Sequence, residues 1–239
     1  SQSVRYNYNS DADCPKWTQA IQNIMAGDAE LVRYFQKVLG YSITGDISEQ
    51  CFFIFYGFGA NGKSVCLEVM RMCTGDYALD TPFSTFEQNK YNTQSNDLAR
   101  LNGARIVSSS ENSSARRLNE ERLKSITGGD PITARFLHRE FFSFKPQCKI
   151  VLAVNTLPQV EDNSHGFWRR VQTIPFSVCF KGESRNDHLI DELRLEKAGI
   201  INWMIEGLKL WQSEGLNSPE KVIRQSHEYE YESNPVIEF

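Results

Sequence analysis

The segment that most constrains the fold is "FFIFYGFGANGKSVCLEVM", residues 52–70, where an apolar run, a glycine-rich turn and a helix-like pattern follow one another directly. Residues 57–64 fit the pattern G-x-x-x-x-G-K-[ST], and a strand before it and a helix after it are the context that this pattern requires. Such a loop wraps phosphate groups with backbone N–H groups, and the new helix adds the positive end of its dipole. The sequence therefore predicts an α/β core that binds a nucleoside triphosphate.

The side chains of this loop have separate expected roles. Lys63 is expected to contact the β and γ phosphates, and the Ser64 hydroxyl to bind Mg²⁺. Glycine is required wherever a side chain would hold the ligand away from the backbone. The predicted nucleotide-binding residues are Gly57, Gly59, Asn61, Gly62, Lys63, Ser64 and Val65.

Four later apolar runs are typical of strands, and a helical pattern at 119–127 lies between two of them. The runs are 104–110, 131–137, 140–144 and 148–154. Alternation of strands and helices indicates an α/β core built on a largely parallel sheet.

Helical patterns are expected at both ends of the chain. Residues 14–25 and 29–41 carry apolar stripes at helical spacing, Asp28 is suited to cap the second of them, and the tail from residue 186 is helical again. Trp203 and Trp211 of that tail are expected to pack these helices. We therefore expect a helical region at 1–48, the core at 49–180 and a helical segment at 181–239. The Asn- and Gln-rich residues 87–97 are expected to form a loop.

The composition excludes several classes of protein. The six cysteines contain no CxxC pair and the four histidines no HExxH, so the sequence lacks zinc-site spacing. No apolar run approaches the roughly 18 residues of a membrane span, so we expect a soluble, cytoplasmic protein without membrane contact. The net charge is −4, but residues 100–149 hold ten Lys or Arg against five Asp or Glu. This local excess favours a basic surface, although a solvated face is the alternative.

Candidates for phosphate chemistry stand where strands are expected to end. Glu111 closes the run 104–110 and is suited to polarise a water, although an ordinary solvated glutamate is the alternative. Asn155 follows the run 148–154 and is suited to orient that water, although asparagine also forms turns. The adjacent Arg169 and Arg170 are either a surface pair or a contact to the nucleotide of a neighbouring subunit.

The runs 131–137 and 140–144 predict a hairpin whose tip lies near Leu137, His138 and Arg139. Cationic side chains at such a tip can follow the phosphates of a single strand, and affinity should then fall with added salt. An edge hairpin with solvated charges is the alternative. The nearby Phe141, Phe142 and Phe144 are expected to belong to the core.

Five segments in a fixed order carry a family resemblance: "GFGANGKS", "SSSE", "LKSITGGDPITARFLHREFFSFKPQ", "IVLAVNTLP" and "GFWRRVQTIPF". They resemble the superfamily 3 helicases, the AAA+-like motors of viruses, phages and plasmids. The likeness is to the phage/plasmid primase-helicase branch, which is related to the poxvirus-type primase-helicases, and it covers roughly residues 14–180. It implies a RecA/AAA+-type P-loop NTPase core flanked by small helical regions.

The resemblance implies a role for individual residues. Lys63 belongs to the Walker A motif, Glu111 matches the Walker B acid that also helps to hold Mg²⁺, and Asn155 matches the sensor 1 residue. Arg170 matches the arginine finger that acts on a neighbour's nucleotide, with Arg169 as the alternative. Lys124 lies in a motif that precedes the DNA-gripping hairpin of these helicases. One departure is Ser110, because many P-loop ATPases carry an aspartate there.

The resemblance also implies an activity. It predicts an ATP- and Mg²⁺-dependent DNA helicase domain that moves on single-stranded and forked DNA as a homo-hexamer, with a primase or polymerase module upstream in the same chain, in the cytoplasm of a host cell. A replication initiator that melts an origin without travelling is the alternative, and unwinding of a long forked duplex would distinguish the two. A small-molecule kinase is a further alternative, which DNA-stimulated ATP turnover without a phosphorylated product would exclude.

Overall fold

The computed structural model of the chain describes residues 3, 8–88, 95–111 and 116–234. The strands are β1 (Phe52–Tyr56), β2 (Ala78–Asp80), β3 (Ile106–Glu111), β4 (Ile132–Ala134), β5 (Phe142–Phe144), β6 (Lys149–Val154) and β7 (Val171–Pro175). The α-helices are α1 (Pro15–Ile24), α2 (Ala29–Ser42), α3 (Lys63–Thr74), α4 (Ser95–Arg100), α5 (Glu120–Gly128), α6 (His165–Trp168), α7 (Leu189–Leu195), α8 (Lys197–Glu214) and α9 (Glu220–Ser233). Short 3-10 helices are η1 (Gly75–Tyr77), η2 (Phe83–Phe86) and η3 (Gly182–Ser184).

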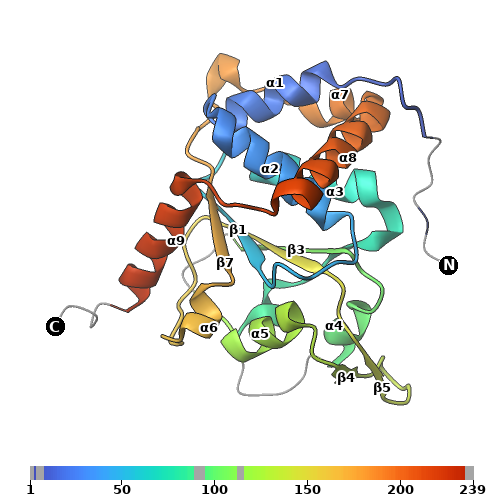
Figure 1. The fold of residues 1–239 in the computed structure, drawn as a ribbon, viewed down its shortest axis with the longest axis vertical. Coiled ribbons are helices and arrows are strands. Elements are labelled where there is room, and N and C mark those ends of the chain that lie inside the picture. Colours follow the sequence, from blue (N-terminus) through green and yellow to red (C-terminus); the bar gives the residue numbers. More distant parts are fainter. Residues whose placement is uncertain (1–2, 4–7, 89–94, 112–115, 235–239) are drawn as a thin grey trace.

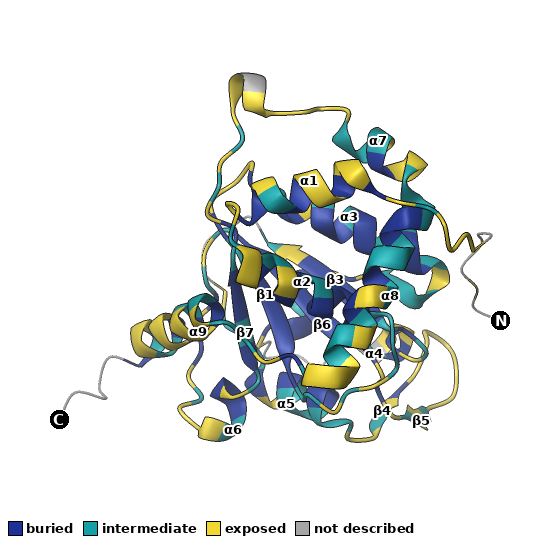
Figure 2. Cartoon of the chain, turned by 45° about the horizontal axis from the view of Figure 1, so that its top comes forward, coloured by how far each residue is buried: buried dark blue, intermediate teal, exposed yellow. Residues whose placement is uncertain are grey.

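Five strands form one sheet in the order β2-β3-β6-β1-β7, and every neighbouring pair in it is parallel. The expected α/β core with a largely parallel sheet, flanked by helices from both ends of the chain, is confirmed. β1, which leads into the glycine-rich loop, lies between β6 and β7 and is buried on both faces, as an apolar run of this kind requires. Figure 2 shows the buried strands at the centre of the molecule.

The two faces of the sheet carry separate cores. Phe53 and Phe55 pack with residues of α1, α2, α3, α7 and α8, whereas Phe52 and Ile54 pack with residues of α5, α6 and η2. This division follows from the alternation of side chains along a strand. Figure 1 shows the first group of helices above the sheet and α4, α5 and α6 below it, with α9 at the β7 edge.

Helices from the two ends of the chain pack on each other. The rings of Trp17 in α1 and Trp203 in α8 meet edge to face at 5.6 Å, and those of Tyr41 in α2 and Trp211 in α8 lie 4.7 Å apart. The packing role expected of Trp203 and Trp211 is therefore confirmed. Helices α1, α2, α7 and α8, from the two ends of the chain, form one layer on one face of the sheet.

Two glycines allow α2 and α8 to approach closely. A Cβ on Gly40 would lie 2.0 Å from the backbone nitrogen of Leu208, and one on Gly207 would lie 2.0 Å from the carbonyl oxygen of Gln36. We expect Gly40→Ala to lower the free energy of unfolding by about 3 kcal/mol, because backbone atoms of the facing helix would have to move. Urea denaturation measures this change. Gly166→Ala is the control, since a Cβ there meets no atom closer than 3.7 Å. Equal stability of both variants would contradict the proposed close packing.

Some expected elements differ from the structure. The runs 131–137 and 140–144 contain only the short strands β4 and β5, which pair with each other in a separate antiparallel hairpin. The chain between them projects from the body, so its residues have no neighbouring strand to pair with. Residues 95–97 belong to α4, so the expected loop was wrong at its end, and residues 89–94 lie outside the described residues. Strand β2 was missed because three residues give too little periodicity.

Candidate functional site

The loop between β1 and α3 has a backbone that only small residues allow. Gly62, the residue before α3, has a φ of 90°, in the left-handed region. A Cβ on Gly57 would lie 2.2 Å from the carbonyl oxygen of Phe176. The loop is anchored to the chain after β7, because the Phe180 N–H donates to the Ala60 carbonyl at 2.7 Å. The backbone is thus held in a tight turn by the chain that follows β7.

Lys63 is the central side chain of this loop. It is 7% exposed, and its Nζ donates to the Gly57 carbonyl, to Asn61 Oδ1 at 3.1 Å and to Asn155 Oδ1 at 3.1 Å. Burial lowers the pKa of the Lys63 ammonium below its ordinary value. Asn61 also donates from Nδ2 to the Phe176 carbonyl at 3.2 Å, so it holds both the loop and the lysine. The fold therefore brings the predicted residues Lys63, Asn61 and Asn155 together.

Glu111 lies at the same edge of the sheet. It ends β3 opposite Val154 of β6, and Val154 in turn lies opposite Tyr56 of β1. Because these strands are parallel, the residues that end β3, β6 and β1 form one row. The glycine-rich loop begins directly after Tyr56 and Asn155 directly follows Val154, so the three predicted elements share this edge.

The carboxylate of Glu111 has a partner that the sequence did not indicate. Its Oε2 lies 3.2 Å from Nε of Arg116, whose Nη1 lies 3.0 Å from Oε2 of Glu87. The hydrogen bond with Glu87 raises the pKa of Arg116 above its ordinary value. The basic pair at 116–117 was counted only as part of the local charge excess, and nothing in the sequence assigned it to Glu111.

A cavity of about 880 Å³ opens beside the loop. This volume lies within the range of small-molecule sites. Its walls come from α1, from Phe180 and from the start of α7; outside the loop they include Gln19, Asn23, Ile24, Asn155, Leu189 and Ile190. Sequence reasoning missed the walls from α1 and α7, because their residues carry no motif and only the fold brings them to the loop.

The residues present fit a nucleoside triphosphate with Mg²⁺. The backbone at Gly57 and Gly62 leaves no room for larger side chains, and a buried ammonium points into the loop. The predicted metal ligands are Ser64, exposed in the first turn of α3, and Glu111. Mg²⁺ is commonly held by one or two carboxylates together with the substrate's phosphates, so two protein ligands, one of them a carboxylate, are sufficient. Ser110, which was noted as the departure from the family pattern, is exposed beside Glu111. In the described part of the chain, no three His, Cys, Asp or Glu residues gather as a metal cluster.

Arg169 and Arg170 lie at the opposite end of the strands. The Arg170 carbonyl accepts a hydrogen bond from the Phe52 N–H, so the pair precedes β7 beside the start of β1. The five residues of β1 separate them from the loop by about 16 Å. Arg170 is half-buried and donates from Nε to Thr127 Oγ1 at 3.2 Å and from Nη1 to the Gly166 carbonyl, whereas Arg169 is exposed and donates to Gln50 Oε1 at 2.6 Å. Burial, then the charge of Arg169, lowers the pKa of Arg170.

The arginine pair lines a second hollow, of about 820 Å³, together with residues of α5. Lys124 lies in this hollow, where its Nζ is 2.7 Å from Oδ2 of Asp162. Lys124, on α5, therefore lines the same hollow as Arg169 and Arg170. It is not part of the hairpin tip.

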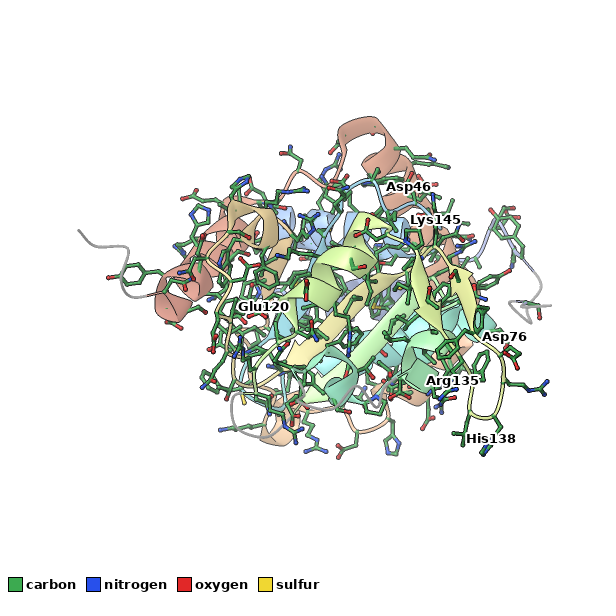
Figure 3. All side chains as sticks on the ribbon, turned by 90° about the horizontal axis from the view of Figure 1, so that it is seen from below. Asp46, Asp76, Glu120, Arg135, His138 and Lys145 are labelled. Carbon is green, nitrogen blue, oxygen red and sulfur yellow. The ribbon has the colours of Figure 1, made fainter. Side chains whose placement is uncertain are left out.

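The predicted hairpin is present, and its tip is exposed. Leu137 is 74% exposed, His138 has a φ of 60°, and the Arg139 N–H donates to the Phe136 carbonyl at 3.0 Å to close the turn. Figure 3 shows His138 at the outer end of the hairpin. The tip residues Leu137, His138 and Arg139 thus project together from the body.

The expected core position of the hairpin phenylalanines is wrong for Phe141, which is 60% exposed. Phe142 and Phe144 are half-buried, and their rings lie 5.7 Å apart. Side chains alternate along a strand, so Phe142 and Phe144 share the face toward the body. Phe141 therefore belongs to the opposite, exposed face.

Two further findings lie outside the site. All six cysteines are free thiols. Within the described residues, no helix has both the length and the apolar character that crossing a bilayer demands.

Comparison with known proteins finds relatives among large DNA viruses. Residues 55–170 match the model of a family of unknown function, DUF5906. The chain is 30% identical to "Putative helicase L207/L206" of Acanthamoeba polyphaga mimivirus over 221 residues, which cover 84% of this chain and 23% of that protein. It is 29% identical to "Putative helicase 022R" of Frog virus 3, over 62% of this chain and 16% of that protein. It is 26% identical to "Putative primase C962R" of African swine fever virus (isolate Warthog/Namibia/Wart80/1980), over 69% of this chain and 18% of that protein.

A solved structure has the same fold. The apo C-terminal region of NrS-1 superposes with a TM-score of 0.72 at 17% identity, over 95% of this chain and 53% of that one. The chain spans about a quarter or less of the curated relatives named above. The resemblance to viral primase-helicases that the motifs indicated is confirmed by these relatives.

Proposed function

We propose that this chain, a relative of the putative helicases and primases of large DNA viruses, is an ATP-driven helicase domain that moves on single-stranded DNA as a ring. The observation that carries the proposal is the contact of Lys63 with Asn155 at the edge of the sheet where Glu111 ends β3. This contact supports the proposal because the glycine-rich loop, Asn155 and Glu111 are far apart in the sequence and share one edge of the sheet.

The residues of the loop would hold ATP and Mg²⁺. Backbone amides of 57–64 and the first turn of α3 would bind the phosphates, and Lys63 would exchange its present oxygen acceptors for phosphate oxygens. Bound Mg²⁺-ATP supplies a terminal phosphate whose transfer to water releases the energy for movement. Asn155, once released by Lys63, is suited to orient the attacking water, and Glu111 to polarise it.

The position of the arginine pair supports a ring. Arg169 and Arg170 lie at the end of β1 and β7 away from the loop of their own chain, so within one subunit they are too distant to contact its nucleotide. A neighbouring subunit would present its loop to them. We assign the contact to Arg169, which is exposed, and a bracing role to Arg170, which is bonded to Thr127 and Gly166.

The hairpin would contact DNA. His138 and Arg139 are exposed at its tip, and a charged side chain there can contact phosphates without selecting a base sequence. The relatives are about four times as long as this chain, since the matched residues cover 16–23% of them, and they include a protein named a primase. This supports a primase or polymerase module joined to the same polypeptide.

A double variant tests the role of the hairpin. We expect His138→Ala with Arg139→Ala to retain ATP turnover without DNA and to lose unwinding of a forked duplex about tenfold or more, because the tip contacts DNA and lies outside the nucleotide site. Strand displacement and ATP hydrolysis are measured in parallel. The matched control is His227→Ala with Arg224→Ala, since these residues are likewise exposed, on α9. Unwinding at the wild-type rate in the hairpin variant would refute the proposal.

A further inference from the structure

The hairpin has two unlike faces. Ile132 and Phe144 lie opposite each other and pack against the core below the sheet, and Ala134 lies opposite Phe142 on the same face. The other face carries Thr133 and Ser143, which are exposed and share a hydrogen bond at 2.8 Å. One face thus attaches the hairpin to the body, and the other is available to a partner.

Phe141 precedes β5 and, by alternation, belongs with Ser143 on the exposed face. The Arg135 guanidinium carbon lies 4.7 Å from the centre of the Phe141 ring, and this ring is nevertheless 60% exposed. Packing of the protein therefore accounts for Phe142 and Phe144 but not for Phe141. An exposed ring paired with a guanidinium presents an apolar plane and a positive charge together.

The surroundings of this ring are cationic. Arg135, Arg139 and Lys145 lie along the hairpin with Glu140 as the acid among them, and all are exposed. Figure 3 shows Arg135 and His138 near the outer end and Lys145 near the other. The surface therefore favours a partner that is an anion and has flat apolar rings.

We propose that Phe141 and Arg135 form a base-stacking subsite for single-stranded DNA. The inference rests on the proposed function and extends it, because contact of the tip with phosphates requires no base, whereas this subsite does. A base can stack on the ring or on the guanidinium while the neighbouring cations contact the phosphates on either side. In duplex DNA the bases are stacked on one another, so the subsite selects single strands.

The experiment compares two single strands that differ only in their bases: oligo(dT) and an abasic strand of equal length with the same sugar-phosphate backbone. We expect Phe141→Leu to bind oligo(dT) about fivefold or more weakly, which is the lower end of the contribution of one stacked base. Its affinity for the abasic strand should equal that of the wild type. Phe141→Trp should retain the affinity for oligo(dT), because the aromatic plane is kept. Fluorescence anisotropy measures all of these affinities.

Tyr231→Leu serves as the matched control, because Tyr231 is 52% exposed and lies on α9, away from the hairpin. Equal weakening toward both strands in Phe141→Leu, or no weakening toward oligo(dT), would overturn the subsite. A change of particle mass in Phe141→Leu without a change of DNA affinity would overturn it as well, and would assign the ring to contact with a second copy of the chain.

The variant with His138→Ala and Arg139→Ala separates the two proposals. If it binds both strands weakly while Phe141→Leu binds oligo(dT) normally, the hairpin contacts DNA but the stacking subsite is refuted. If it binds both strands as the wild type does, the contact of the hairpin tip with DNA is refuted, whatever the result for Phe141→Leu.

Discussion

Replacement of Lys63 by alanine is expected to lower ATP turnover about a thousandfold, because the loop then lacks the one ammonium that can neutralise charge on the terminal phosphates. Preorganised groups of this kind are effective because they are held in a partly dry site, and Lys63 is 7% exposed. Steady-state phosphate release measures turnover, and a fluorescent ATP analogue measures binding.

Two variants accompany this measurement. Lys209→Ala, on the exposed side of α8, is the control for loss of a lysine and should hydrolyse ATP normally. Lys63→Arg keeps the charge but not the size of the ammonium group, and should remain impaired because Asn61 and Asn155 leave room for a single small donor. Turnover near the wild-type rate in Lys63→Ala would show that the glycine-rich loop is not the hydrolytic site.

Loss of the arginine finger is expected to have a comparable effect with normal nucleotide binding. Arg169→Ala should lower turnover about a thousandfold and leave the stability of the chain unchanged, because its guanidinium is exposed. In Arg170→Ala the free energy of unfolding should fall by about 2 kcal/mol, because Thr127 Oγ1 and the Gly166 carbonyl lose the guanidinium that donates to them. Turnover and urea denaturation of each variant distinguish the two arginines. Full turnover in Arg169→Ala with impaired turnover in Arg170→Ala would transfer the finger to Arg170.

Mixing experiments test whether the finger acts between subunits. Equal amounts of the Lys63→Ala and Arg169→Ala chains should recover about a quarter of the wild-type turnover, because half of the intact loops would face an intact arginine when subunits mix at random. Neither chain alone recovers activity. If the mixture is as inactive as its components, the arginine and the loop do not belong to different subunits.

The local elements of the fold were predictable because each has its own sequence signal. The apolar run at 52–56, the glycines after it and the capping Asp28 predicted β1, the loop and the start of α2 correctly. Pairing at a distance has no such signal. The position of β6 between β1 and β3 depends on which apolar faces can be buried together, and single-chain periodicity does not encode that choice.

The site shows the same limit. Lys63 and Asn155 were predicted from motifs, and the structure places them 3.1 Å apart. The ion pair of Arg116 with Glu111 was not predicted, because no local sequence pattern distinguishes an arginine that contacts a carboxylate from one that faces solvent. Phe141 was assigned to the core because phenylalanine usually lies there, but in the structure it directly precedes β5 and is 60% exposed.

The separation of the loop and the arginine pair along β1 bears on how copies of the chain assemble. If the arginine pair of one copy contacts the glycine-rich loop of the next, the copies join head to tail. Each added copy then leaves one loop and one arginine pair available for further copies. Such contacts do not terminate in a pair: they close on themselves when the rotation between neighbours divides a full circle, and otherwise continue as a helical filament. Dilution should therefore abolish hydrolysis more steeply than it would in a two-fold dimer.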